Sequence, residues 1–456
     1  MTTAIRPSGS RGTGGRGTDS TATGDGPPAG GLLRLEDALA RMLDGVEPLA
    51  LEKVELADAH GRVLGEAIDS RLTLPPWDNS AMDGFAVRAA DTAAASATSP
   101  VRLRVAGEVA AGVAPAARVE PGTALRILTG APLPEGADAV VPVEQTDAAA
   151  GVAELPASVG VLAAVEPGAH VRRAGSDIGA GARLLDAGRE LGPAELALAA
   201  AGGHGQLAVH RRPLVAVLAT GDELVAPGRP LGAAQIPDSN SIGLAAQARE
   251  AGAVTLALGI SRDRRADVVV ALRRALDDGA DVIVVSGGVS VGAHDVVKDA
   301  FAEVGRIDLW RVAVQPGKPL AFGRAGGALL FGLPGNPVSS LVTFELFVRP
   351  VLRRLGGQRD ATDAANRADR AGREVVRATL SEPVRKDPAR RAFLRVRLAR
   401  VADGDASGAL WSASLAGGQG SHVLSALAAA DGLAIVPEGL AELPAGAVVE
   451  VLRLRQ

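Results

Sequence analysis

Short apolar runs alternate with amphipathic stretches through the second half of this chain, and this alternation predicts its main folded unit. Within residues 212–355 the pattern predicts buried strands at 214–219, 254–260 and 281–285, and helices at 241–251, 264–278 and 338–352. Strands and helices that alternate in this way are typical of a mostly parallel, doubly wound α/β sheet. Because ligands of such sheets bind beyond the carboxyl ends of the strands, the residues after each strand are the first candidates for chemistry.

The remainder of the chain carries weaker patterns. We expect an amphipathic helix at 33–46, a small β-rich unit at 101–146, where short apolar runs are broken by Pro and Gly, and an Ala-rich helix near 193–201. A charged linker at 357–373 leads into a β-patterned tail. Residues 1–30 have almost no apolar content and are expected to be disordered.

Composition narrows the classes of function. With 456 residues the chain is too long for one core, and its net charge of -4 gives no electrostatic signature for nucleic acid or an anionic membrane. No apolar run is long enough to span a bilayer and no signal peptide precedes the fold, so a soluble cytoplasmic protein is expected. Cysteine is absent, and the 6 histidines show no metal-ligand spacing. Catalysis is therefore expected from carboxylates, basic groups and backbone dipoles.

A Gly/Ser loop, Ser286-Gly-Gly-Val-Ser-Val-Gly292, lies between the predicted strand at 281–285 and a helix that starts near Val296. Glycines let a backbone approach a ligand closely, and the free N–H groups at a helix start attract anions. One such loop is weak evidence. However, Thr220-Gly-Asp-Glu-Leu224 and Leu333-Pro-Gly-Asn-Pro-Val338 also follow predicted strands. Three loops of this kind predict one anion-binding crevice.

Carboxylates follow the same strands. Glu223 lies in the loop after 214–219, Asp263 follows 254–260, and Asp295 follows the Gly/Ser loop. Gathered at one sheet edge, these side chains would suit Mg²⁺, which prefers oxygen ligands. Helix capping explains each residue singly but leaves their shared edge as a coincidence, so we favour a cation site.

Two other groups of polar residues have simpler explanations. The loop at 75–87, which contains Asp83, is on its own better explained as a turn with a helix cap. Arg311 and Lys318 flank Gln315-Pro-Gly317 and would suit an oxyanion, whereas solvation normally explains single surface cations.

Taken together, these motifs resemble those of the molybdopterin molybdenumtransferase (MoeA) family, which includes the E domain of gephyrin. The resemblance runs from about Leu33 to the end of the chain. It is carried by the three loops above and by further strings in family order: Asp78-Asn-Ser-Ala-Met-Asp-Gly84, Arg126-Ile-Leu-Thr-Gly-Ala-Pro-Leu-Pro-Glu-Gly136 and Pro316-Gly-Lys-Pro319.

The resemblance implies a homodimer of multidomain α/β subunits. Its implied domains are a discontinuous N-terminal α/β domain I at 31–78 and 166–208, a β-rich domain II at 79–165, a doubly wound domain III similar to MogA and MoaB at 209–356, and a small β-barrel, domain IV, at 372–456. The implied reaction takes adenylylated molybdopterin and molybdate, uses Mg²⁺, cleaves the adenylate and leaves molybdenum on the pterin dithiolene. The adenylyltransferase and the acceptor molybdoenzymes are further implied partners. The lack of cysteine fits this role, because the dithiolene belongs to the ligand.

Matching positions also receive roles from the resemblance. The implied catalytic residues are Asp83, Glu223, Asp263 and Asp295, and the last three are also the implied metal ligands. The implied substrate-binding residues are Thr129, Arg172, Gly287, Gly288, Ser290, Arg311, Lys318, Ser339, Arg391 and Ser421. In a dimer of this family, Asp83, Thr129 and Arg172 would approach the domain III crevice of the other subunit.

Two positions depart from the family pattern, and two other functions stay open. Gln315 stands where some relatives have lysine, which removes a cation, and Pro237 stands where an aromatic residue is usual. One alternative is the molybdopterin adenylyltransferase, whose typical single domain resembles residues 212–355; the additional domains argue against it. The other is a pterin-binding scaffold without turnover, against which the retained acidic residues argue.

Overall fold

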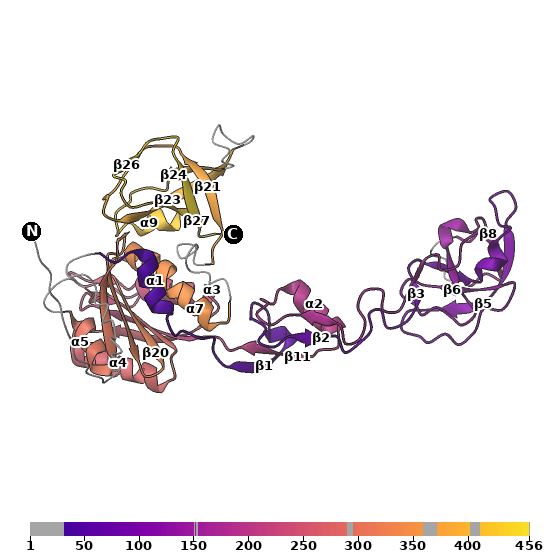
Figure 1. The fold of residues 1–456 in the computed structure, drawn as a ribbon, viewed down its shortest axis with the longest axis horizontal. Helices are drawn as coiled ribbons and strands as arrows, with labels where there is room; N and C mark the ends of the chain where they lie inside the picture. Colours follow the sequence, from indigo (N-terminus) through magenta and orange to yellow (C-terminus); the bar gives the residue numbers. More distant parts are fainter. Residues whose placement is uncertain are drawn as a thin grey trace, which may run out of the picture.

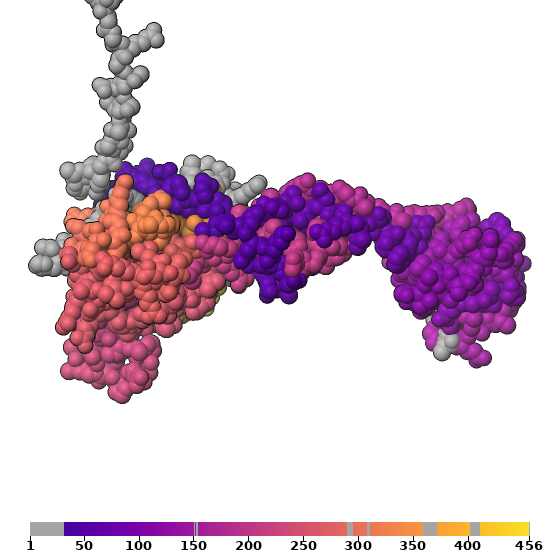
Figure 2. Space-filling model, turned by 90° about the horizontal axis from the view of Figure 1, so that it is seen from below, coloured from indigo at the N-terminus to yellow at the C-terminus, as the bar shows by residue number. Residues whose placement is uncertain are grey.

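The folded units of the chain follow one another along one long axis (Figure 1). An α/β unit and a C-terminal β-barrel lie at one end, a small middle unit comes next, and a β-rich distal unit lies at the other end. The space-filling view shows the same extended shape, with a narrow connection to the distal unit (Figure 2). No helix in the described part of the chain is long and apolar enough to cross a membrane. The computed structural model describes residues 32–149, 151, 154–289, 295–358, 372–401 and 411–455.

A six-stranded sheet forms the α/β unit, and it confirms the predicted doubly wound, mostly parallel architecture. The first four strands of the sheet pair in parallel, with one irregularity in the register at Val217/Leu218, whereas the fifth strand runs antiparallel to both of its neighbours. The strand order is β15 (Val254–Ser261), β12 (Leu214–Thr220), β16 (Val282–Ser286), β20 (Ala328–Leu333), β19 (Pro319–Ala325) and β17 (Arg306–Arg311).

Helices cover both faces of this sheet, because alternate residues of a strand point to opposite sides. From β12, Val215 and Val217 pack into one core with α1 (Leu35–Leu43) and α3 (Asn240–Glu250). Ala216 and Leu218 pack into a second core with α4 (Arg265–Asp277) and α5 (Val296–Val304). The helices predicted at 33–46, 241–251 and 264–278 are therefore present.

The helix predicted at 338–352 is present but not uniform. It consists of α6 (Pro337–Thr343), a π-helical segment η4 (Phe344–Val348) and α7 (Arg349–Leu355). The wider π segment buries Glu345 at 1% exposure, where it pairs with Arg373 (Nε–Oε1 2.6 Å). Nothing in the apolar pattern of this stretch distinguishes a π turn from an α turn.

Five strands of the C-terminal tail close into a barrel, since β23 pairs with both β24 and β25. Its order is β23 (Arg391–Arg400), β24 (Trp411–Leu415), β21 (Val375–Leu380), β27 (Val448–Arg453) and β25 (Gly432–Val436). The short strand β18 (Val314–Gln315), from the α/β unit, pairs with β23, so the two units are joined by a strand pair as well as by a shared core.

The middle and distal units are built from strands far apart in sequence. In the middle unit β1 (Leu51–Glu55) pairs with β11 (Gln206–His210), β2 (Ile68–Asp69) pairs with β10 (Arg183–Leu185), and α2 (Pro193–Ala201) packs beside them. Arg211 ties this unit to the α/β unit through two hydrogen bonds to Asp281, of 2.7 and 2.6 Å.

The distal unit is a five-stranded sheet flanked by a short strand pair, β3 (Asn79–Ser80) with β9 (Val171–Arg172). The strand order of the sheet is β7 (Ala139–Pro142), β4 (Gly84–Val87), β6 (Thr123–Ile127), β5 (Val101–Val109) and β8 (Ser158–Val161). The β-rich unit expected at 101–146 is present within it.

Candidate functional site

The loops that follow β12, β16 and β20 meet at the carboxyl edge of the α/β sheet. Gly287 and Gly288 adopt positive φ angles of 97° and 64°. A Cβ on Gly287 would lie 2.3 Å from the carbonyl oxygen of Thr220, and a Cβ on Gly335 would lie 3.6 Å from the Cα of Gly287. The predicted convergence of three loops is therefore present, and Gly287 is required by both its backbone angle and its close approach to Thr220. The predicted Ser290 lies outside the described residues.

Asn240, the first residue of α3, links two of these loops. Its Nδ2 donates to Ser286 Oγ at 2.7 Å and to the carbonyl oxygen of Gly335 at 2.8 Å. Asp238 is 3% exposed and accepts from the backbone N–H of Ser241 at 3.0 Å, which fixes the start of the helix. The motif Pro237-Asp-Ser-Asn240 was visible in the sequence, but this clamp depends on contacts between residues far apart in the chain.

The acidic residues after β12 and β15 lie close to one another. Desolvation raises the pKa of the Asp263 carboxyl group, and the nearby charges of Glu223 and Asp222 raise it further. Glu223 and Asp263 were predicted as metal ligands, and Asp222, the neighbour of Glu223 in the same loop, had no separate role in that prediction. Mutual repulsion of this kind marks a place where positive charge would be favourable. Within the described ranges, no cluster of three or more His, Asp or Glu side chains is arranged to hold a metal ion.

Asp295 has a capping role in this structure. It is 3% exposed, and its Oδ1 accepts from the backbone N–H of Lys298 at 2.9 Å, which caps α5. The helix-cap explanation thus applies to this residue. A role for Asp295 as a metal ligand or in catalysis stays a prediction.

The predicted cations lie at the end of the same sheet, on the barrel side. Arg311 ends β17, and Lys318 follows it after a turn in which Val312 N–H donates to the Lys318 carbonyl oxygen at 3.0 Å. Both side chains are exposed. Gly317, in the same turn, has a φ of 112°, and a Cβ there would lie 2.4 Å from Thr343 Oγ1, so the turn packs directly on α6. The Oε1 atom of Gln315 is buried without a hydrogen-bond partner among the described residues.

Three other predicted substrate-binding residues lie where α6, α1 and the barrel meet. Ser339 is 5% exposed within α6, and the carbonyl oxygen of Ser421 accepts from Val338 N–H at 3.1 Å. The guanidinium of Arg391 is engaged by Glu36 (2.7 Å) and Glu438 (3.1 Å) and so ties α1 to the barrel. Its assigned role in holding substrate stays a prediction.

The remaining predicted residues lie in the distal unit. Asp83 Oδ1 accepts from the backbone N–H of Thr129 at 2.6 Å and from its hydroxyl at 2.8 Å, and these hydrogen bonds lower the pKa of Asp83. Arg172 lies in β9, opposite Asn79. Asp83 also lines a cavity of about 630 Å³ together with Phe85. Figure 1 shows the distal unit at the opposite end of the molecule from the α/β unit, so one chain does not bring these residues to the crevice.

Comparison with known families covers nearly all of the described chain. Residues 33–203 match the MoeA N-terminal region (domain I and II), residues 216–354 the probable molybdopterin binding domain, and residues 377–454 the MoeA C-terminal region (domain IV). The crystal structure of the molybdopterin biosynthesis MoeA protein of Pyrococcus horikosii superposes with a TM-score of 0.73 at 34% identity, covering 93% of this chain and 100% of that one. Fold and site together define a MoeA-type protein with a molybdopterin-binding domain.

Sequence relatives make the assignment more specific. Molybdopterin molybdenumtransferase 2 of Mycobacterium tuberculosis is 42% identical over 419 residues, which cover 91% of this chain and 96% of the relative. The molybdopterin molybdenumtransferase of Nostoc sp. is 38% identical over 408 residues, 88% of each chain. The chain belongs to the molybdopterin molybdenumtransferase family, as its motifs predicted.

Proposed function

We propose that this protein is an enzyme of molybdenum cofactor biosynthesis that inserts molybdate into adenylylated molybdopterin, cleaving the adenylate and releasing AMP. The observation that carries the proposal is the meeting of the Gly287–Gly288 cradle with Glu223 and Asp263 at one sheet edge. A backbone that can receive phosphate beside carboxylates that can receive a cation suits phosphoric anhydride cleavage. Membership of the molybdopterin molybdenumtransferase family supports the proposal independently.

Cleavage of the adenylate requires the crevice to stabilise the phosphate charge and to align the attacking oxygen of water or molybdate. When an oxygen of water or molybdate attacks phosphorus, a new P–O bond forms and the anhydride P–O bond breaks, with its electron pair leaving on the departing phosphate. If water attacks, its proton passes to a carboxylate of the crevice. We assign the phosphate charge to the cradle N–H groups, Arg311 and Lys318, because oriented dipoles and cations stabilise charge that develops in the transition state.

The proposal includes Mg²⁺ as cofactor. The donor chemistry fits, since Glu223 and Asp263 offer oxygen ligands, and desolvation together with the charges of Glu223 and Asp222 raises the pKa of Asp263. A cation bound there would relieve this repulsion and would screen the phosphate charge of the substrate. By family position we assign Asp295 to the same step, as the residue that orders the start of α5 beside the phosphate.

The proposal also requires a homodimer. Asp83, Thr129 and Arg172 occupy family functional positions but lie in the distal unit, remote from the crevice of their own chain. An antiparallel pair of elongated subunits would place each distal unit at the crevice of the other subunit, with the same surfaces used twice. Each crevice would then be completed by the partner chain.

The test is a reconstituted reaction. Purified protein is incubated with adenylylated molybdopterin, Mg²⁺ and molybdate, while AMP release and the activation of a cofactor-free molybdoenzyme are followed. We expect molybdate-dependent AMP release together with reconstitution, and both should be lost in Asp263→Ala. Tight pterin binding with neither AMP nor active cofactor would instead identify a binding scaffold.

A further inference from the structure

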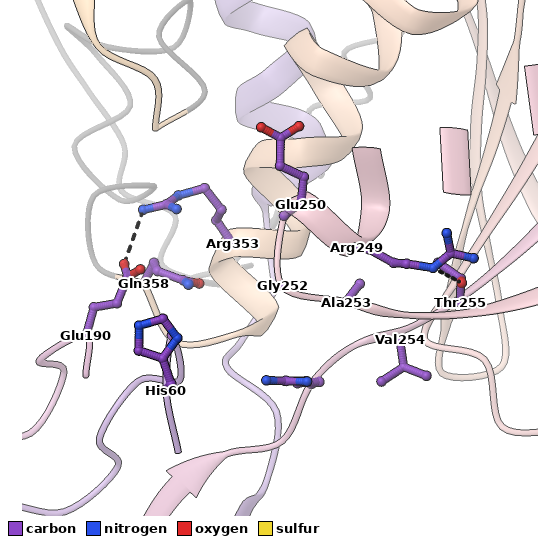
Figure 3. Close-up of a pocket in the computed structure, with 13 residues that line it drawn as sticks. His60, Glu190, Arg249, Glu250, Gly252, Ala253, Val254, Thr255, Arg353 and Gln358 are labelled. Carbon is purple, nitrogen blue, oxygen red and sulfur yellow. Dashed lines mark hydrogen bonds and ion pairs between the residues drawn. The ribbon is translucent and has the colours of Figure 1, made fainter. Parts of the chain in front are cut away.

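A second cavity, of about 670 Å³, lies between the middle unit and the α/β unit, away from the crevice (Figure 3). His60 and Glu190 line it from the middle unit, and Arg212, the segment from Arg249 to Thr255, and Arg353 line it from the α/β side. Its volume falls within the range of about 300–1,000 Å³ that is typical of small-molecule sites. The family features described above do not use it.

The charge of this cavity is positive, although the whole chain carries a net charge of -4. Arg212, Arg249 and Arg353 face two carboxylates. One of them, Glu250, is already held by both terminal nitrogens of Arg373 at 2.7 and 3.1 Å, and these bonds lower its pKa. The other, Glu190, lies 3.8 Å from Arg353 and is 53% exposed. Among the described residues that line the cavity, the three arginines therefore outnumber the two carboxylates.

These arginines also have unused hydrogen-bond donors. Arg249 uses Nε to donate to Thr255 Oγ1 at 3.0 Å, and within the described ranges its two terminal nitrogens have no acceptor. The Nε of Arg353 is buried without a partner among the described residues. A buried donor without an acceptor is unfavourable, and a ligand that supplies acceptor oxygens would remove this cost.

The backbone of the cavity wall limits the type of recognition. The N–H groups of Gly252, Ala253 and Val254 are already bonded to carbonyl oxygens of Arg249, Ala248 and Pro213. A ligand must therefore be held by side chains, and guanidinium groups match phosphate oxygens in geometry and charge. Figure 3 shows Arg353 directed toward Glu190 on one side and Arg249 directed toward Thr255 on the other, so the ligand must be extended.

We propose that this cavity is a binding site for an extended small polyanion with several phosphate groups, which bridges Arg249 and Arg353 and contacts Arg212 between the two units. Both inorganic triphosphate and a nucleoside triphosphate share this chemistry. The two ligands differ in the nucleoside, whose base would add affinity only by packing on the cavity wall. Inorganic monophosphate offers a single phosphate group to the three arginines and should bind more weakly.

The experiment is calorimetric titration of the full-length protein with inorganic triphosphate, ATP and monophosphate at physiological salt, which suppresses non-specific surface binding. The titrations are repeated with Gly287→Ala, whose blocked crevice removes any binding at the proposed active site. We expect triphosphate binding to the cavity to persist in Gly287→Ala. Substitution Arg212→Gln or Arg249→Gln should weaken it at least about tenfold, as loss of a charge-assisted hydrogen bond implies.

Arg104→Gln is the matched control, because Arg104 is an exposed arginine of the distal unit whose removal changes the net charge equally. Affinity that falls as much in Arg104→Gln as in Arg212→Gln would mean non-specific attraction and would overturn the proposal. So would the absence of triphosphate binding, or binding that disappears only in Gly287→Ala. Equal affinity for ATP and inorganic triphosphate would identify phosphate alone as the recognised group.

Discussion

A distal-unit variant and a crevice variant should restore each other's activity when they are combined in one dimer. Asp83→Ala removes the acceptor of two hydrogen bonds from Thr129, and Asp263→Ala removes a carboxylate from the crevice. Both side chains are exposed, so Asp263→Ala should change the free energy of unfolding by no more than about 0.5 kcal/mol. Asp83→Ala should cost about 1–3 kcal/mol, because it loses two hydrogen bonds of about 0.5–1.5 kcal/mol each. Each homodimer should nevertheless lose AMP release, because neither of its crevices is complete.

The magnitude follows from the symmetry of the proposed dimer. In a heterodimer of the two variants, one crevice combines intact Asp263 with intact Asp83 from the other chain, and the second crevice lacks both. The heterodimer should therefore show about half the wild-type activity, and a random mixture of subunits about one quarter, because heterodimers form about half of it.

The assay uses co-expression with two different affinity tags, tandem purification of the heterodimer and measurement of molybdate-dependent AMP release. The matched control pairs a wild-type chain with the double variant Asp83→Ala/Asp263→Ala. If the crevice is shared between chains, this control has no complete site and should be inactive. If both residues serve a site within one chain, the control keeps about half the activity and the first heterodimer is inactive, which refutes the reasoning.

Three further predictions concern stability and the crevice. The pKa of Asp263 is raised in the folded state, so its ionisation disfavours folding. The variant Asp263→Asn should therefore unfold at a higher urea concentration than the wild type at pH 7. This gain in stability should vanish as the pH falls through the folded-state pKa toward the unfolded value of about 4. Glu345→Gln should cost about 3–5 kcal/mol in chemical unfolding, since it removes the buried carboxylate that Arg349 and Arg373 share. A cost below about 1 kcal/mol would contradict this. Gly287→Ala should abolish pterin binding measured by titration. Gly279→Ala, with φ of 77° and no atom within 4 Å of the added Cβ, should bind normally and lose only about 1 kcal/mol of stability.

The fold of the α/β unit and its crevice could be predicted largely because local pattern and topology agree. A parallel sheet brings the residues after β12, β15 and β16 to the same edge whatever their side chains are, so Glu223, Asp263 and Gly287 could be grouped before any contact was known. The glycine positions were predictable for a similar reason. A Cβ at Gly287 would lie 2.3 Å from the carbonyl oxygen of Thr220, so where two such loops meet only glycine fits.

Features that depend on pairing between distant segments could not be predicted. The Asn240 clamp needs Ser286 and Gly335 as acceptors, and neither is a neighbour in sequence. The π-helical turn at η4 has the same apolar pattern as an α-helix, and it becomes intelligible only when the buried Glu345 is seen to meet Arg373 across a unit boundary. Asp222 and Glu223 are adjacent carboxylates in one loop, and the sequence does not show which of them faces Asp263; in the structure both charges act on it.

Arg391 is predicted to bind substrate from its family position, but in the structure it forms ion pairs with two carboxylates. Its side chain is 11% exposed, and its guanidinium pairs with Glu36 of α1 and with Glu438 of the barrel. Desolvation opposes its charge, but these two carboxylates prevail, and the pKa of Arg391 is raised. If Arg391 also binds substrate, the anion must compete with two carboxylates for the same donors, so binding would loosen the tie between α1 and the barrel. Substrate affinity and the docking of the barrel would then be linked, and weakening the tie with Glu438→Gln should increase affinity for molybdate, whereas a purely structural Arg391 predicts no change in that affinity.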